Sequence, residues 1–157
     1  MYSFEPVAFV INNRNDIGDD NWGNVISEIV LSDMIQPESL TGIEDFSHLE
    51  IIFYFHKADR SKINLSSTHP RNNIEFPKVG IFAQRKKARP NLLGSTIVKL
   101  LRKENNILTV SGLDAINGTP VIDIKPVIRE FMPVENIRQP PWATELMKKY
   151  WDKEAES

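Results

Sequence analysis

The sequence has no cysteine, which excludes disulfide bonds and metal sites built on thiolates. It also lacks a run of about 18–20 apolar residues, the length that a membrane-spanning helix needs. The longest apolar stretch, 49–55, is interrupted by Glu50. The first residues do not show the basic and then apolar pattern of a secretory signal. These absences predict a soluble cytoplasmic protein that makes no membrane contact.

Several motifs that carry common chemistries are missing as well. There is no glycine-rich dinucleotide motif, no P-loop, no H-E-x-x-H and no G-x-S-x-G. The three histidines, His48, His56 and His69, have neither the spacing nor the cysteine neighbours of a metal site, so no metal is predicted. An enzyme with this sequence would therefore act mainly by positioning its substrates.

The composition is that of a globular protein, but its charge is unevenly distributed. The chain has 157 residues, of which 41% are hydrophobic and 25% charged, which suits one domain with a core. The net charge of −2 alone argues against nucleic-acid binding. Residues 57–89, however, hold nine lysines and arginines against two acidic residues, which leaves −9 on the rest. This basic segment is either a solvated loop or a contact for phosphate.

Short apolar segments separated by polar turns predict strands. These strands are expected over 4–12, 24–31, 46–56, 78–84, 94–103, 106–114 and 120–125. The segment 46–56 is the strongest and is expected to be nearly buried on both faces, whereas 56–77 reads as a long loop. A short helical turn is predicted over 36–42 and a helix over 141–150.

This pattern predicts a mainly β fold, a small single-domain β-barrel with a few short appended helices, among them a C-terminal helix. Strands and helices do not alternate as they do in a Rossmann-like domain. We expect the barrel domain over 1–135 and a helical extension over 136–157 that packs on the barrel or on a partner subunit. The aromatic Trp142, Tyr150 and Trp151 would make that contact.

Two segments, 79–95 and 111–126, each deliver the end of a strand into a polar turn that contains a glycine. Arg85 and Arg89 offer planar guanidinium groups to a carboxylate or a phosphate. Pro90 forces Arg89 into an extended conformation. In the second segment Asp114, Thr119 and Asp123 either line a polar site or only cap turns.

The stretches "GIFAQRKKARPNLLGS" and "GLDAINGTPVIDIKP", preceded by "GIEDFSHLEIIFYFHK", resemble the three blocks of the TsaA-like, or TrmO, methyltransferase family. The resemblance covers roughly residues 5–133. Characterised members methylate N6 of threonylcarbamoyladenosine beside the anticodon of tRNA. The resemblance thus implies a small barrel that forms a homodimer, S-adenosyl-L-methionine as cofactor and tRNA as partner. It also implies which positions of this chain form the site.

Carried over position by position, the resemblance places the cofactor on His56, Lys57, Phe82, Arg85, Leu93, Gly94, Ser95, Ser111, Gly112, Leu113 and Asp114. The residues themselves predict the substrate contacts, since a basic stretch can hold tRNA phosphates and a polar turn or strand face can hold a ligand. These contacts are expected at Arg71, Lys78, Lys86, Lys87, Arg89, Asn91, Asp123 and Lys125. Asp114 would hold the ribose hydroxyls or the ammonium of the cofactor.

The catalytic base stays open between His48, His56 and Asp114, and His56 and Asp114 are the main candidates. For His48, inside an apolar strand, a hydrogen-bonded core histidine is the favoured interpretation.

The chain departs from the family pattern in its first loop, where Asp19–Gly23 replaces a Pro-Arg-Gln stretch, and at Val127, where a tyrosine is usual. Trp22 in this loop would either stack on adenine or cap the barrel. Two alternatives therefore stay open: a non-catalytic barrel that binds a nucleotide or RNA, and a methyltransferase that acts on a small molecule.

Overall fold

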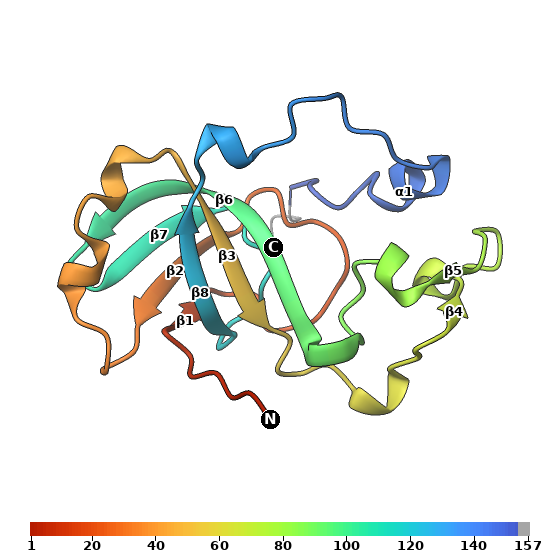
Figure 1. The fold of residues 1–157 in the computed structure, drawn as a ribbon, viewed down its shortest axis with the longest axis horizontal. Helices are drawn as coiled ribbons and strands as arrows, with labels where there is room; N and C mark the ends of the chain where they lie inside the picture. Colours follow the sequence, from red (N-terminus) through yellow and green to blue (C-terminus); the bar gives the residue numbers. More distant parts are fainter. Residues whose placement is uncertain (154–157) are drawn as a thin grey trace.

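The computed structural model describes residues 1–153 and folds them around a closed antiparallel barrel (Figure 1). The strands follow one another around the barrel in the order β1-β2-β7-β6-β3-β8. Their bounds are Ala8–Ile11 (β1), Ile26–Leu31 (β2), His48–Tyr54 (β3), Leu93–Glu104 (β6), Ile107–Ser111 (β7) and Pro120–Pro126 (β8). The predicted mainly β barrel is confirmed, and the strands predicted over 94–103 and 106–114 form the hairpin β6–β7.

The barrel is filled by side chains that alternate along its strands. In β3, Leu49, Ile51 and Phe53 point inward and are at most 1% exposed, whereas the residues between them are half-buried. The prediction that both faces of this strand are nearly buried is wrong, because its second face lies on the outside of the barrel. His48, the first residue of β3, is exposed, and its Nδ1 lies 2.7 Å from Ser47 Oγ. It is not the core histidine that we expected.

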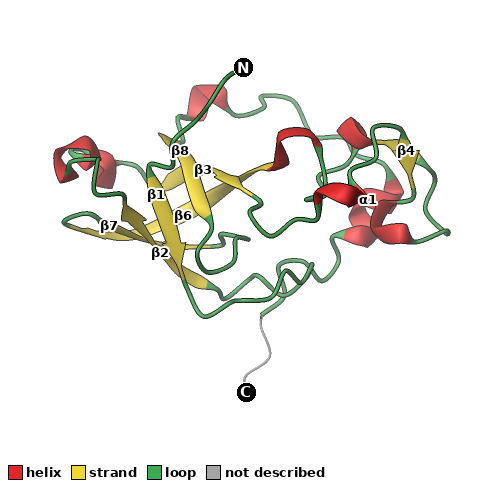
Figure 2. Ribbon diagram, turned by 90° about the horizontal axis from the view of Figure 1, so that it is seen from below, coloured by secondary structure: helices red, strands yellow, loops and turns green. Residues whose placement is uncertain are grey.

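Between β3 and β6 the chain leaves the barrel and forms a small lobe (Figures 1 and 2). The lobe contains a two-stranded sheet, β4 (Ser67–Thr68) and β5 (Val79–Gly80), and the 3-10 helices Arg60–Lys62, Pro70–Asn72, Ile81–Ala83 and Pro90–Leu92. The predicted strand 78–84 is therefore mostly wrong. The chain turns after Gly80, and the buried Gln84 donates hydrogen bonds back to Thr68 O and Val79 O.

The remaining helices are short. Pro37–Leu40, where a helical turn was predicted, and Ile43–Asp45 connect β2 to β3, and Arg129–Phe131 follows β8. The C-terminal helix α1 spans only Pro141–Leu146, shorter than the predicted 141–150, and lies beside the β4–β5 lobe in both views (Figures 1 and 2). The last four residues of the predicted extension, 154–157, lie outside the described residues. Within 1–153, no helix has the length and apolarity to cross a membrane.

Candidate functional site

Some of the predicted site residues, His56 and Asp114 among them, lie at one end of the barrel, where β3 and β7 end and β6 and β8 begin. The loop 112–119 crosses this end and is tied to β1 by two backbone hydrogen bonds. Gly118 N donates to Val10 O at 2.7 Å, and Val10 N donates to Thr119 O at 2.9 Å. The Thr119 hydroxyl, in a side chain only 2% exposed, donates to Ile116 O at 2.6 Å. These bonds hold the loop, and with it Asp114, on the barrel.

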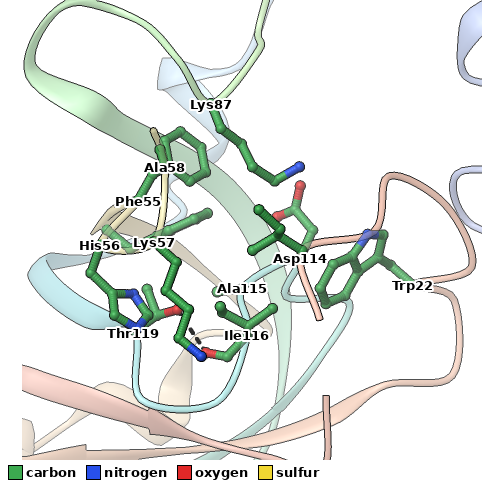
Figure 3. A pocket seen from close by; sticks show the side chains of 12 residues that line it. Trp22, Phe55, His56, Lys57, Ala58, Lys87, Asp114, Ala115, Ile116 and Thr119 are labelled. Atoms are coloured by element: carbon green, nitrogen blue, oxygen red, sulfur yellow. Dashed lines mark hydrogen bonds between the residues drawn. The ribbon is translucent and has the colours of Figure 1, made fainter. Parts of the chain in front are cut away.

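A narrow pocket opens beside this loop (Figure 3). Its walls are Ile17, Trp22, Phe53, Phe55, His56, Lys57, Ala58, Lys87, Asp114, Ala115, Ile116 and Thr119. Three of the predicted cofactor residues, His56, Lys57 and Asp114, thus come together, and Lys87 extends from the lobe toward Asp114 (Figure 3). The space left between these side chains is about 20 Å³, room for roughly one water molecule.

Asp114 is the polar centre of the pocket. Its two carboxylate oxygens each accept a hydrogen bond from a hydroxyl, one from Thr96 on β6 and one from Tyr150 near the C-terminus. Burial and the negative charge of Asp114 raise the pKa of Tyr150 well above its ordinary value. Neither donor was predicted from the sequence. Thr96 stood in an unremarkable strand, and the aromatic spacing around Tyr150 indicated only a helix packing face.

His56 follows β3 directly and lines the same pocket. Partial burial and the positive charge of Lys57 lower the pKa of His56, so its imidazole is neutral at neutral pH and its free nitrogen can accept a proton. His48 begins β3, eight residues before His56, and so stands at the opposite end of this extended strand. That position removes it from the candidate bases.

The predicted cofactor residues of the lobe and of β6 support the pocket or lie outside it. Gly94 packs so closely that a Cβ atom there would lie 2.7 Å from ring atoms of Phe53 and Phe55. On the outer face, Arg85 donates to Ser95 O at 2.6 Å, and Ser95 Oγ donates to Glu50 at 2.9 Å. The others are placed as follows: Phe82 is 79% and Leu93 41% exposed, Ser111 ends β7, Gly112 turns the chain with φ of 82°, and Leu113 is in the core.

Several predicted substrate residues are already paired inside the molecule. Arg71 contacts Asp20 at 3.1 Å, and Lys87 contacts Asp19 at 3.3 Å, so the first loop and the basic segment are joined. Lys125 pairs with its strand neighbour Asp123 at 2.7 Å. The rest are placed as follows: Lys78 is exposed, Lys86 is half-buried, Arg89 donates to Gln84 O from the extended backbone predicted before Pro90, and Asn91 forms a turn with φ of 64°.

Trp22 caps this end of the molecule. It is 1% exposed and packs with Val25, Ile116 and Tyr150. The guanidinium of Arg14 lies 3.9 Å from its ring centroid, a cation–π contact. Of the two roles predicted for Trp22, capping is the one that the structure shows.

The chain resembles known proteins over most of its length. Residues 19–131 match the family model of the tRNA-methyltransferase O N-terminal domain. The chain is 42% identical over 102 residues to a human tRNA (adenine(37)-N6)-methyltransferase. The aligned region covers 65% of this chain and 23% of that protein. It is 33% identical over 126 residues to a probable S-adenosyl-L-methionine-binding protein of Methanocaldococcus jannaschii. This aligned region covers 80% of this chain and 91% of that protein.

The fold comparison agrees with these sequence matches. A crystal structure of TrmO from P. aeruginosa superposes with a TM-score of 0.73 at 28% identity, over 90% of this chain and 62% of that one. The chain therefore spans less than two thirds of both the human relative and the crystallised TrmO. With the barrel, the match over 19–131 and these relatives in agreement, the chain belongs to the family of the tRNA-methyltransferase O N-terminal domain.

Proposed function

We propose that this protein is an S-adenosyl-L-methionine-dependent methyltransferase that methylates N6 of threonylcarbamoyladenosine beside the anticodon of tRNA. The family and the names of its relatives support this proposal. The observation that carries it is the Asp114 carboxylate at the end of the barrel, bordered by aromatic rings and by two lysines.

The chemistry of the pocket fits the cofactor. Asp114 already accepts two hydroxyl hydrogen bonds, which is what a ribose diol would offer it. Phe55, which is half-buried against Phe53 with ring centroids 5.3 Å apart, supplies apolar surface for a nucleobase. Lys57 and Lys87 supply positive charge for a carboxylate. When bound, S-adenosyl-L-methionine supplies a methyl group activated by its positively charged sulfur.

The protein's own contribution is orientation and the removal of one proton. Holding two reactants in line contributes up to roughly 7–11 kcal/mol to the lowering of a barrier. The acceptor nitrogen is conjugated with a carbonyl and is a poor nucleophile, so its N–H proton must leave as the new N–C bond forms. The neutral imidazole of His56 accepts that proton, whereas the Asp114 carboxylate is engaged by hydroxyl groups.

The first test is isothermal titration with S-adenosylmethionine and S-adenosylhomocysteine on the wild type and on Asp114→Asn. We expect saturable binding that weakens about tenfold or more in the variant, because a hydrogen bond to a charged group is lost. Absence of binding both by the wild type and by Tyr150→Phe, in which the Tyr150 bond to Asp114 is removed, would refute the proposed function.

The second test is methyl transfer to tRNA from cells that lack the modifying enzyme. His56→Gln should reduce kcat about 10²-fold or more, as expected for loss of a general base. The matched control His48→Gln, at the other end of the same strand, should keep wild-type activity. Cofactor binding without transfer to any RNA would favour the non-catalytic barrel.

A further inference from the structure

Residues 149–152, which we call the C-terminal strap, lie along the first loop at residues 21–23. Three backbone hydrogen bonds join them: Asn21 N donates to Lys149 O at 3.1 Å, Trp22 N to Tyr150 O at 2.9 Å and Gly23 N to Asp152 O at 2.9 Å. The approach is so close that a Cβ atom on Gly23 would lie 2.0 Å from Trp151 O. Only a glycine at position 23 therefore permits this docking.

The strap inserts Tyr150 among the residues of the candidate pocket. Its hydroxyl donates to Asp114, and its ring packs with Trp22, Val25 and Ile116. The negative charge of Asp19 and the positive charge of Arg85 both influence the pKa of this phenol, so these side chains also lie near it. The phenol hydroxyl thus occupies an acceptor site on Asp114 that a ligand hydroxyl would use.

With the strap docked, the pocket is too small for a nucleoside. The space beside Asp114 is about 20 Å³, whereas sites for small ligands have volumes of roughly 300–1,000 Å³. A ligand of that size can enter only if side chains move. Tyr150, which is bonded to Asp114, belongs to a segment outside the barrel.

The strap is attached in a way that allows it to leave. Residues 133–141, which connect it to the barrel, are all exposed, and α1 has only six residues. The contact of α1 with the lobe includes Trp142 and Phe76, whose ring centroids are 6.4 Å apart. The backbone bonds of the strap go to the first loop, so its release leaves the barrel ladder intact.

We propose that the C-terminal strap is a built-in plug of the cofactor pocket, in which Tyr150 holds Asp114 until the ligand displaces it. This inference rests on the proposed function, since the ligand is the cofactor named there. The observed association constant for that ligand is then the intrinsic constant multiplied by the fraction of molecules whose strap is released. Changes that release the strap without touching the pocket should strengthen binding.

The test compares S-adenosylhomocysteine binding by isothermal titration in full-length variants. Gly23→Ala should expel the strap and bind about tenfold more tightly or better. The control Gly80→Ala, where a Cβ atom meets nothing within 4 Å, should bind like the wild type. Tyr150→Phe, which keeps the ring and removes only the hydroxyl bond, should also bind more tightly. Weaker binding by both Gly23→Ala and Tyr150→Phe would show that the strap is part of the bound site and would overturn the proposal.

Hydrogen exchange at the Trp22 and Gly23 amides, together with the binding data, distinguishes failure of the plug from failure of the proposed function. In the wild type, the ligand should accelerate exchange of both amides as their strap partners leave, and slower exchange would overturn the plug. Wild-type binding with unchanged affinity in Gly23→Ala overturns the plug but leaves the proposed function standing. If neither the wild type nor the released variants bind, the proposed function fails and the plug fails with it. Exchange in the free proteins still shows whether Gly23→Ala released the strap.

Discussion

Gly94 lies where β6 begins, against the rings of Phe53 and Phe55, and the distance of 2.7 Å leaves no room for a methyl group. Two aromatic rings and the backbone of a barrel strand cannot all shift without loss of packing. We therefore expect Gly94→Ala to lower the free energy of unfolding by about 1–3 kcal/mol. Urea denaturation measures this change.

The same substitution at Gly80 is the control for Gly94→Ala. Gly80 has open space around it and an extended backbone with φ of −64°. An alanine there should be neutral or should stabilise the protein by up to about 1 kcal/mol. Equal stability of the two variants would contradict the close packing at Gly94.

Tyr150 makes the stability of the protein depend on pH in the alkaline range. Burial, and then the charge of Asp114, raise its pKa above the ordinary value of 10.0. The folded protein thus holds the phenol proton more strongly than the unfolded chain does. The resulting stabilisation is complete below about pH 10 and is lost as the pH rises further.

We expect an ultraviolet titration of the wild type to show one tyrosine of three that ionises later than an ordinary one. Tyr150→Phe should remove that late step. The stability difference between the wild type and Tyr150→Phe should also shrink above pH 10. A late step that persists in Tyr150→Phe would belong to another residue and would contradict the assignment.

At the scale of elements, Asn12 joins β1, β2 and the loop that carries Asp114. Its Nδ2 donates to Ser27 Oγ at 2.8 Å and to Ala115 O at 2.9 Å. Asn12→Asp has the same shape but loses both donors and places a negative charge beside a carbonyl oxygen. We expect the free energy of unfolding to fall by about 1–3 kcal/mol, measured by urea denaturation.

The neighbouring Asn13 is the matched control for Asn12→Asp because it is exposed. Asn13→Asp should change stability by less than about 0.5 kcal/mol. A similar loss in both variants would mean that the added charge, and not the lost hydrogen bonds, destabilises the protein.

The barrel strands could be predicted because each carries its own signal. Alternation over 24–31 and the β-branched residues of 120–125 reproduce β2 and β8 to within a few residues. The segment 78–84 looked equally strand-like, yet only Val79 and Gly80 pair, because the chain turns after Gly80 and Gln84 donates back to Val79 O and Thr68 O. Local propensity does not contain that tertiary contact.

Part of the candidate site could be predicted because its residues stand in segments that carry their own sequence signal. His56, Lys57 and Asp114 stand in recognisable blocks and do meet in one pocket. Tyr150 reaches Asp114 across 36 residues, through a strap that docks on a loop outside those blocks. Helical spacing around Tyr150 instead predicted four more residues of helix than the chain forms.

At the scale of the whole molecule, the charge segregation seen in the sequence is partly cancelled in the fold. The basic segment 57–89 meets the acidic pair of the first loop, where Arg71 and Lys87 contact Asp20 and Asp19. These side chains are about a quarter to a half exposed, so each pair contributes roughly 0–1 kcal/mol to stability. Their larger effect is on the field that an approaching phosphate meets.

The double variant Asp19→Asn/Asp20→Asn should therefore bind tRNA more tightly, with a steeper dependence on salt. Each cation freed to contact a phosphate should add up to about 0.9 to the slope of log K against log salt. Titration at several salt concentrations, followed by fluorescence anisotropy, measures that slope.

The control Asp33→Asn/Asp45→Asn makes the same change in net charge at two exposed positions between β2 and β3. If the effect came from net charge alone, the affinity for tRNA would rise equally in both double variants. A gain confined to the first-loop variant would instead assign the phosphate contacts to Arg71 and Lys87. An unchanged slope there would show that the RNA approaches another face.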